Sequence, residues 1–157
     1  APACTTNRTS ERSIPMPNPA VGGRPAMEAR LYDVVGLAVS SKGDVHFVDK
    51  GSNRVRKIDA LTGIVSTVAG VCRYGYDGDD KPAIRAMLHA PEAVVFDQQD
   101  HLYVSDTMNH RVRKVDAVTG IITTVAGNGD SGYEDKVVDQ LAKELHLALQ
   151  YPEGAMV

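Results

Sequence analysis

The chain has 157 residues, of which 43% are hydrophobic and 24% are charged, a balance typical of an ordinary globular protein. Its formal net charge of −3 argues against a general affinity for nucleic acids, because proteins that bind phosphate backbones usually carry a basic excess. No apolar run approaches the roughly 20 residues of a membrane-spanning helix, so membrane insertion is not expected.

Residues 1–21 are predicted to form an N-terminal tail or linker. They contain Cys4, and the only other cysteine is Cys72, so the two are either unrelated thiols or a disulfide that ties the tail to a loop. Asn7 begins an Asn-Arg-Thr sequon for N-glycosylation in this polar context. The chain starts at Ala1 without a methionine or a signal peptide, as a processed secretory protein or a trimmed chain would. These features favour an extracellular or secreted protein.

The rest of the chain contains an internal repeat with a period of 57 residues. RVRKIDALTGIVSTVAG at 54–70 returns as RVRKVDAVTGIITTVAG at 111–127. A third copy begins near the end, where Pro-Glu at 152–153 matches Pro-Glu at 91–92 after 61 residues. The four additional residues lie in the segment 135–149, and four residues are about one helical turn.

Each copy contains four short runs with the boundaries of β-strands. The runs are 36–40, 44–49, 54–59 and 64–70 in the first copy, and 93–97, 101–106, 111–116 and 121–127 in the second. The turn sequences DALTG and DAVTG join the last two runs, and they combine an aspartate that bonds the turn backbone with a glycine that accepts positive φ. Val112 and Val115 have opposite parity, which predicts a β-bulge in the third run.

Four antiparallel strands per copy, with no helix between consecutive strands, are typical of the blades of a β-propeller. We therefore predict an all-β fold with four-stranded blades at 22–70 and 79–127, and the first strand of a third blade within 135–157. A lone blade cannot bury its two apolar faces, and propellers typically close at about four to eight blades. The chain is then either a piece of a longer propeller or a subunit whose blades are completed by other chains.

These motifs resemble the NHL repeat, whose blades read roughly P-x-G-V/I-A-V-D-x-x-G-N-x-Y-V-A-D-x-x-N-x-R-I/V-x-K. The second copy, PEAVVFDQQDHLYVSDTMNHRVRKVD at 91–116, matches almost throughout, whereas Val34, Ser40 and Ser52 depart from the pattern in the first copy. The resemblance covers residues 22–157. It implies the propeller fold but no particular chemistry, because NHL propellers include enzymes, RNA binders and adhesion modules.

Two charged pairs recur with the repeat. Asp49 and Asp106 end the second runs, and Arg54 and Arg111 open the third runs. We interpret them as a structural framework, in which each aspartate caps the hairpin and pairs with an arginine across it. A recurring ligand clamp is the alternative, but a binding site usually breaks the symmetry of a repeat.

No catalytic or metal site is expected. Amidating lyases with an NHL-type propeller bind metal through histidines from several blades. The five histidines of this chain do not recur at equivalent positions of the repeat; these histidines are His46, His89, His101, His110 and His146. The acidic sequence DGDD at 77–80 fails the calcium-loop pattern, so its carboxylates are expected to be solvated. No G-x-S-x-G nucleophile motif is present. We expect no cofactor and no enzymatic activity.

Two other features have ordinary explanations. The third runs contain basic stripes at 54–57 and 111–114. Because 20 acidic residues in the chain offset 17 basic ones, we expect these stripes to form a solvated or salt-bridged edge and not an RNA-binding surface. The segment 135–149 has a helical apolar face that is expected to pack on its own blade, with docking of a partner helix as the alternative.

The sequence therefore predicts a non-catalytic NHL propeller module that acts as an extracellular scaffold for a protein or glycan partner. The loops at 71–90 and 128–151 differ between copies and are expected to carry specificity. The candidate binding residues in them are Arg73, Tyr74, Tyr76, Asp77, Tyr133 and Glu134. One alternative is a structural subunit of an assembly or filament. The other is a fragment of a propeller lyase or hydrolase whose catalytic residues lie on other blades.

Overall fold

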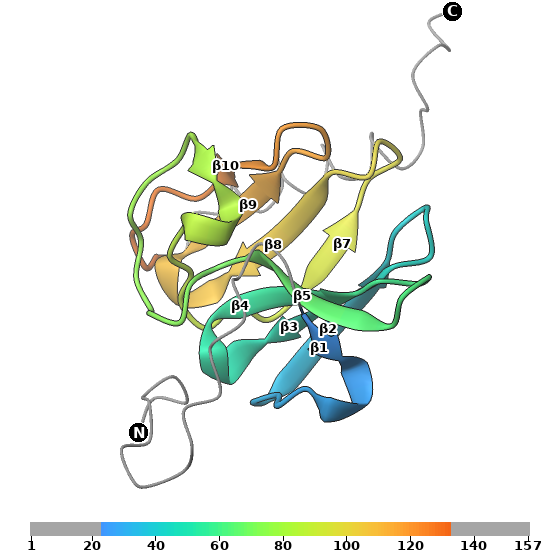
Figure 1. Cartoon of the computed structure of the whole chain (residues 1–157). Helices are drawn as coiled ribbons and strands as arrows, with labels where there is room; N and C mark the ends of the chain where they lie inside the picture. The colour runs from blue at the N-terminus through green and yellow to red at the C-terminus, as the bar shows by residue number, and fades with distance from the viewer. Residues whose placement is uncertain (1–22, 133–157) are drawn as a thin grey trace, which may run out of the picture.

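The computed structural model describes residues 23–132, which form two five-stranded antiparallel sheets (Figure 1). The all-β prediction is confirmed: within these residues there is no α-helix, and the four helical segments are three-residue 3₁₀ turns. None of these turns is long enough to cross a membrane. The predicted tail at 1–21 and the predicted start of a third blade at 135–157 lie outside the described residues.

The first sheet has the strand order β1-β5-β4-β3-β2. Its strands are β1 (Arg24–Pro25), β2 (Val34–Val39), β3 (Val45–Asp49), β4 (Arg54–Ile58) and β5 (Ile64–Ala69). The turn η1 (Ala26–Glu28) follows β1, and η2 (Lys50–Ser52) connects β3 to β4. β-Branched residues fill much of the longer strands, where their restricted side chains suit extended backbone.

The second sheet repeats this order as β6-β10-β9-β8-β7. Its strands are β6 (Lys81–Pro82), β7 (Val94–Phe96), β8 (Leu102–Asp106), β9 (Arg111–Val115) and β10 (Ile121–Ala126), with the turns η3 (Ala83–Arg85) and η4 (Thr107–Asn109). Each sheet therefore has five strands and not the predicted four. The additional strands β1 and β6 are two residues long and pair with β5 and β10, and a run that short carries no alternation in the sequence.

The predicted turn chemistry between the last two strands of each sheet is confirmed. Asp59 Oδ1 accepts hydrogen bonds from the backbone N–H of Leu61 at 3.1 Å and of Thr62 at 2.8 Å. Gly63 has a φ of 66°, a conformation in which a side chain would be strained. The second sheet repeats this arrangement with Asp116, Val118, Thr119 and Gly120.

The predicted β-bulge lies in a different strand. The registers of β3 with β4 and of β8 with β9 are continuous, whereas those of β4 with β5, of β9 with β10 and of β2 with β3 shift. The additional residues are Val68 in β5, Val125 in β10 and Gly36 in β2. Val112 and Val115 simply face opposite sides of β9, and the buried Arg113 shares the face of Val115.

The apolar core lies between the two sheets. The buried members are Val48, Val55 and Ala69 from the first sheet, Val94, Leu102, Val104, Val115 and Ile122 from the second, and Ala83, Ala86 and Leu88 from the segment between them. At one edge, the rings of His46 and Phe96 meet edge-on with centroids 4.7 Å apart. Gly36 allows the sheets to approach closely, because a Cβ atom there would lie 2.6 Å from the carbonyl oxygen of Glu92.

Polar bonds cross the same interface and fix the orientation of the sheets. Lys50 Nζ lies 2.7 Å from Glu92 Oε1. The backbone N–H and the hydroxyl of Ser41 both donate to the carboxylate of Asp100, the former at 3.0 Å. The contact is therefore a specific one, with apolar side chains in the middle and paired polar groups around them.

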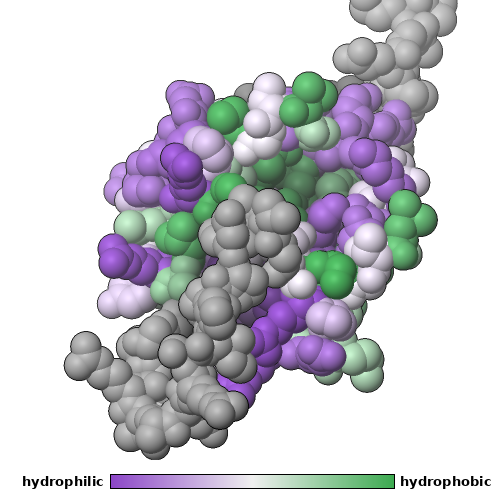
Figure 2. All heavy atoms as spheres, in the orientation of Figure 1, coloured by the Kyte–Doolittle hydropathy of each residue, from purple (hydrophilic) through white to green (hydrophobic). Residues whose placement is uncertain are grey.

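The two sheets use unlike faces in this contact, so each keeps exposed apolar positions on its other face, although Phe47 on the outer face of the first sheet is buried. Val94 is only 7% exposed because it packs against the first sheet, but Leu37, its equivalent one repeat earlier, is 68% exposed on the outer face of the first sheet. Conversely, Ala38 packs against the core, whereas its equivalent Val95 is 48% exposed. In Figure 2, the visible hydrophobic atoms gather near the middle of the molecule, and hydrophilic residues cover much of the margin.

Candidate interaction surface

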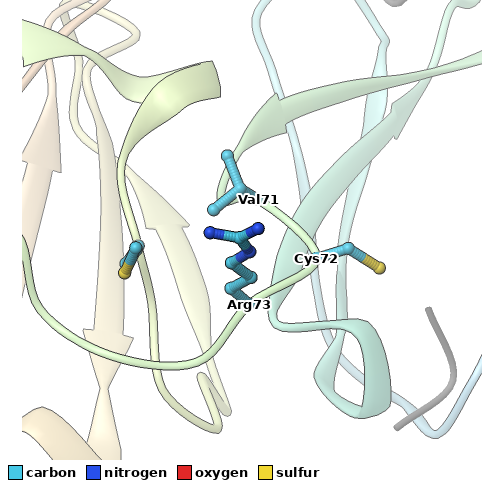
Figure 3. Close-up of a pocket in the computed structure, with 4 residues that line it drawn as sticks. Val71, Cys72 and Arg73 are labelled. Atoms are coloured by element: carbon cyan, nitrogen blue, oxygen red, sulfur yellow. The ribbon is translucent and has the colours of Figure 1, made fainter. Parts of the chain in front are cut away.

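The segment 70–80, which joins β5 to β6, carries four of the predicted binding residues and passes from the first sheet to the second (Figure 1). Val71, Cys72 and Arg73 line a surface pocket together with Met87. Figure 3 shows the Arg73 guanidinium reaching toward Val71, with the Cys72 side chain pointing away.

Arg73, Tyr74, Tyr76 and Asp77 are all exposed, but Tyr76 and Asp77 also make contacts that hold the loop to the second sheet. Tyr74 is 68% exposed, and its ring centroid lies 5.0 Å from that of His89 at an interplanar angle of 32°. We call Arg73, Tyr74 and His89 the Tyr74 surface. An exposed aromatic ring beside a cation combines a large apolar area with polar groups, as in many binding interfaces.

Tyr76, by contrast, is used inside the fold. The guanidinium carbon of Arg111 lies 3.8 Å from its ring centroid, and that of Arg113 lies 4.9 Å from it. Arg111 also donates to the carbonyl oxygens of Asn109 at 2.8 Å and Asn128 at 2.7 Å. Tyr76 therefore holds the loop against β9 through cation–π contacts.

Asp77 has a similar internal role. It accepts a hydrogen bond from the backbone N–H of Met87 at 2.9 Å, and its carboxylate lies 3.1 Å from Lys81 Nζ. Partial burial of Asp77 opposes ionisation, but these two interactions outweigh it and lower the pKa of the carboxyl. Asp77 is exposed, as expected for the DGDD carboxylates, and it also makes these two contacts within the protein.

The framework aspartate of the second sheet pairs with a different arginine from the predicted one. The Asp106 carboxylate is buried and accepts hydrogen bonds from the His89 backbone N–H at 2.7 Å, from Asn109 Nδ2 at 2.8 Å and from an Arg113 guanidinium nitrogen at 3.3 Å. Arg111 is its neighbour across the strands, but it stacks on Tyr76. Burial raises the pKa of Asp106, and the three donors oppose that rise.

Arg113 fastens the acidic loop to the sheet, a role that the sequence did not indicate. Its fully buried side chain donates to the Gly78 carbonyl oxygen at 2.9 Å and to Asp79 Oδ1 at 2.8 Å, and Thr124 donates to the same oxygen at 3.0 Å. Arg113 was grouped with a basic stripe that was expected to be solvated or salt-bridged, whereas strand alternation places it, like Arg111, on the face of Asp106. That alternation is the signal that would have identified it.

In the first sheet, the structure places Asp49 and Arg54 together. Asp49 is fully buried and accepts a hydrogen bond from the Tyr32 backbone N–H at 2.8 Å. Its second oxygen lies 3.7 Å from Arg54 and 3.6 Å from Arg56. These charged groups hold the segment before β2 to the end of β3. Because they are engaged within the fold, we do not expect them to bind a ligand.

Among residues 23–132, no three histidine, cysteine or carboxylate side chains gather as metal ligands would. His101 Nδ1 accepts a hydrogen bond from the Ala117 backbone N–H at 3.0 Å and lies 3.4 Å from Asp116. His46 is buried at the contact between the sheets, and burial lowers its pKa; the Asp44 carbonyl oxygen partly opposes this and nearby Lys57 adds to it.

Several predicted features lie outside the described residues, so their roles remain predictions. They are Tyr133, Glu134, Cys4, Asn7 and the segment 135–149.

Comparisons with known proteins identify the repeat. The family model of the NHL repeat matches residues 88–115, which include β7, β8 and β9. Protein SUPPRESSOR OF QUENCHING 1, chloroplastic, from Arabidopsis thaliana is 28% identical over 114 residues, which are 68% of this chain and 11% of that protein. NHL repeat-containing protein 2 from Bos taurus is 32% identical over 105 residues, 61% of this chain and 14% of that protein. The chain thus spans a small part of the length of these relatives.

A solved structure supports the fold. A structural genomics protein of unknown function from Bacteroides thetaiotaomicron superimposes with a TM-score of 0.55 at 22% identity. The match covers 62% of this chain and 24% of that chain. At this identity the likeness concerns the arrangement of the sheets alone.

Proposed function

The chain belongs to the NHL repeat family, and on that premise we propose that its two sheets are adjacent blades of a β-propeller that serves as a non-catalytic scaffold for a protein or glycan partner. One observation carries the proposal: equivalent positions are buried between the sheets and exposed on their outer faces, as for Val94 and Leu37. An arrangement that continues in both directions accounts for these open faces.

The scaffold role is supported by how the polar side chains are used. The aspartates and arginines of the repeat are engaged in holding turns and loops, whereas Arg73 and Tyr74 present an exposed cation and ring. Tyr74 stands on a segment that Tyr76 and Asp77 fasten to the second sheet. A rigidly held aromatic side chain loses little conformational entropy on binding, which favours recognition.

An extracellular location is part of the proposal. It rests on Cys4, Cys72 and the sequon at Asn7. Intact mass before and after reduction, and before and after deglycosylation of the secreted protein, tests it. We expect a shift in both comparisons; no shift in either would remove the support for secretion.

Binding arrays test the scaffold function. The purified chain is screened against glycan and extracellular-protein arrays beside the double variant Arg73→Ser/Tyr74→Ser, with Arg30→Ser, an exposed cation before β2 and outside the Tyr74 surface, as the matched control. We expect ligands that bind the parent and the control but are lost with the double variant. The proposal is contradicted if no ligand binds, or if the double variant retains every ligand.

The open faces also favour a second function, a structural subunit whose blades are completed by other chains. Light scattering as a function of concentration distinguishes it. A mass that rises with concentration supports assembly, whereas a folded monomer at all concentrations excludes it.

A further inference from the structure

The hairpin turns at one end of both sheets form a continuous surface. The backbone N–H of Ala60 donates to Asp44 Oδ1 at 2.9 Å, which links the β4–β5 turn to the β2–β3 turn. Ser41 donates to Asp100 and so joins this end of the first sheet to the β7–β8 turn. The Ala117 backbone N–H donates to His101 Nδ1, which adds the β9–β10 turn. We call these four turns the hairpin end.

Two apolar side chains project from the hairpin end at equivalent positions. Leu61 is 97% exposed, and Val118, its equivalent 57 residues later, is 91% exposed. Beside them, the 3₁₀ turns η1 and η3 are attached to the same turns, because the backbone N–H of Ala26 and Ala83 donate to Gly63 and Gly120. These 3₁₀ turns carry two more exposed apolar residues at equivalent positions, Met27 and Ile84.

This repetition has no explanation within the fold. A framework residue recurs because it contacts its neighbours, but Leu61 and Val118 are almost completely exposed. Their side chains also have no part in the turn, in which Asp59 and Thr62 make the hydrogen bonds. The residue identity has changed between copies while the apolar character has been kept. Together with Met27 and Ile84, they place four exposed apolar side chains at the hairpin end, and exposed apolar groups that lie among polar ones are typical of an interaction site.

The turns hold these side chains in a fixed place. Asp59 Oδ1 accepts three hydrogen bonds within its turn, and the Gly63 backbone N–H donates to the Asp59 carbonyl oxygen at 2.9 Å. The second copy is bonded in the same way around Asp116. An anchor that is rigid before binding loses less entropy when it is buried.

The charges around the anchors select the partner. The turn sequences 40–44, 59–63, 97–101 and 116–120 contain five aspartates and one lysine. Lys57 of β4 lies 2.8 Å from Asp44 and 4.0 Å from Asp59, so the aspartates still outnumber the cations that face them. The hydrogen bonds of the turns lower the pKa values of Asp59 and Asp116, so both carboxylates are ionised at neutral pH. Acidic groups around apolar anchors attract a cationic apolar surface and repel an anionic one, which includes anionic lipid.

We propose that the hairpin end, with Leu61 and Val118 as anchors and the turn aspartates around them, docks a cationic amphipathic segment of a partner protein. This surface is separate from the Tyr74 surface, because His89 is bonded to Asp106, which lies at the end of β8 away from the β7–β8 turn. The hairpin end would thus give the scaffold a second binding surface.

Fluorescence anisotropy with two synthetic amphipathic peptides tests the proposal. They are 14-residue peptides of the same pattern, one of leucine and lysine and one of leucine and glutamate. We expect the leucine–lysine peptide to bind the full chain, and Leu61→Ser/Val118→Ser to weaken binding by about tenfold or more, because two buried aliphatic contacts are lost. Added salt should weaken binding further. The leucine–glutamate peptide should not bind.

Met108→Ser is the matched control, because Met108 is an exposed apolar side chain on the turn η4, at the other end of β8 and β9. It should bind as the parent does. Circular dichroism and the urea midpoint should be unchanged in both variants. Equal binding by the double variant, equal binding of the two peptides, or no binding of the leucine–lysine peptide would overturn the proposal. Vesicle binding that needs Leu61 and Val118 would overturn it in favour of a membrane.

Discussion

At the scale of single residues, the polar network around Asp106 shows how this repeat uses charge. Its buried carboxylate, Arg113 and Asn109 connect β8, β9 and the loop that carries Asp79. Placing such charges out of water is costly unless every partner is present. The network therefore makes the loop conformation depend on a few specific side chains.

Removing one member of this network should be more harmful than replacing both charged members. Arg113→Ala leaves Asp106 buried without its cation, and we expect the free energy of unfolding to fall by roughly 3–5 kcal/mol. The double variant Asp106→Asn/Arg113→Met should lose less free energy of unfolding than the summed losses of Asp106→Asn and Arg113→Met, each measured as a single variant. Urea denaturation measures all of them. A loss below about 1 kcal/mol for Arg113→Ala, or strict additivity, would contradict this view.

His46 should make the contact between the sheets sensitive to acid. Burial holds its pKa below the ordinary value of 6.5, so the unfolded chain binds a proton more readily than the folded chain. The stability that results is present above pH 6.5 and is lost as the pH falls through the folded pKa. We expect His46→Gln to lose less stability than the parent between pH 7 and pH 5, although Lys57, Asp44 and Asp100 remain nearby. If urea denaturation gives the parent and His46→Gln the same dependence of stability on pH, the role assigned to His46 is refuted.

The residue scale is also where the sequence predicted least. Asp49 and Asp106 were found because they recur, but Arg111 and Arg113 share one face of β9, so the choice between them depends on contacts with distant segments, since Arg111 stacks on Tyr76 and leaves Asp106 to Arg113. Tyr76 was a candidate binding residue because it lies in a loop that differs between the copies, whereas in the fold its ring contacts two arginines. Contacts between distant segments carry no local signal in the sequence.

At the scale of elements, the strands and turns were largely predictable because each carries its own local pattern. Short runs bounded by turn residues indicated the eight longer strands, and the Asp-x-x-Thr-Gly sequence indicated the last turn of each copy. The two-residue strands β1 and β6 were missed, since they are defined by pairing with β5 and β10. The bulges were placed one strand too early for the same reason.

Glycines at equivalent turns provide a test at this scale. Gly70 follows β5 with a φ of 90°, and a Cβ atom there would lie 2.3 Å from the Asn53 carbonyl oxygen. Gly63 has a φ of 66° but open space around it. Gly63→Ala should cost about 1–2 kcal/mol from backbone strain alone, and Gly70→Ala should cost clearly more. Urea denaturation of both variants decides the matter, and equal losses would mean that the close approach at Gly70 is not needed.

At the scale of the whole molecule, the two sheets pack through unlike faces and leave one face of each type open. Leu37 and Val39 lie open on the first sheet, and Val95 and Val125 on the second. A contact between unlike faces does not close on itself with two members, so it can continue through further repeats or further chains. The sequence predicted this incompleteness from the period of the repeat, but the identity of the open faces required the structure.

The most direct test of the account is whether the two open faces fit each other. Leu37→Glu/Val39→Glu blocks the face of the first sheet, and Val95→Glu/Val125→Glu blocks the face of the second. The account predicts that each variant alone is a folded monomer by light scattering, and that an equimolar mixture gains a species of twice the mass. A mixture that stays monomeric at high concentration, although both variants are folded, would contradict it.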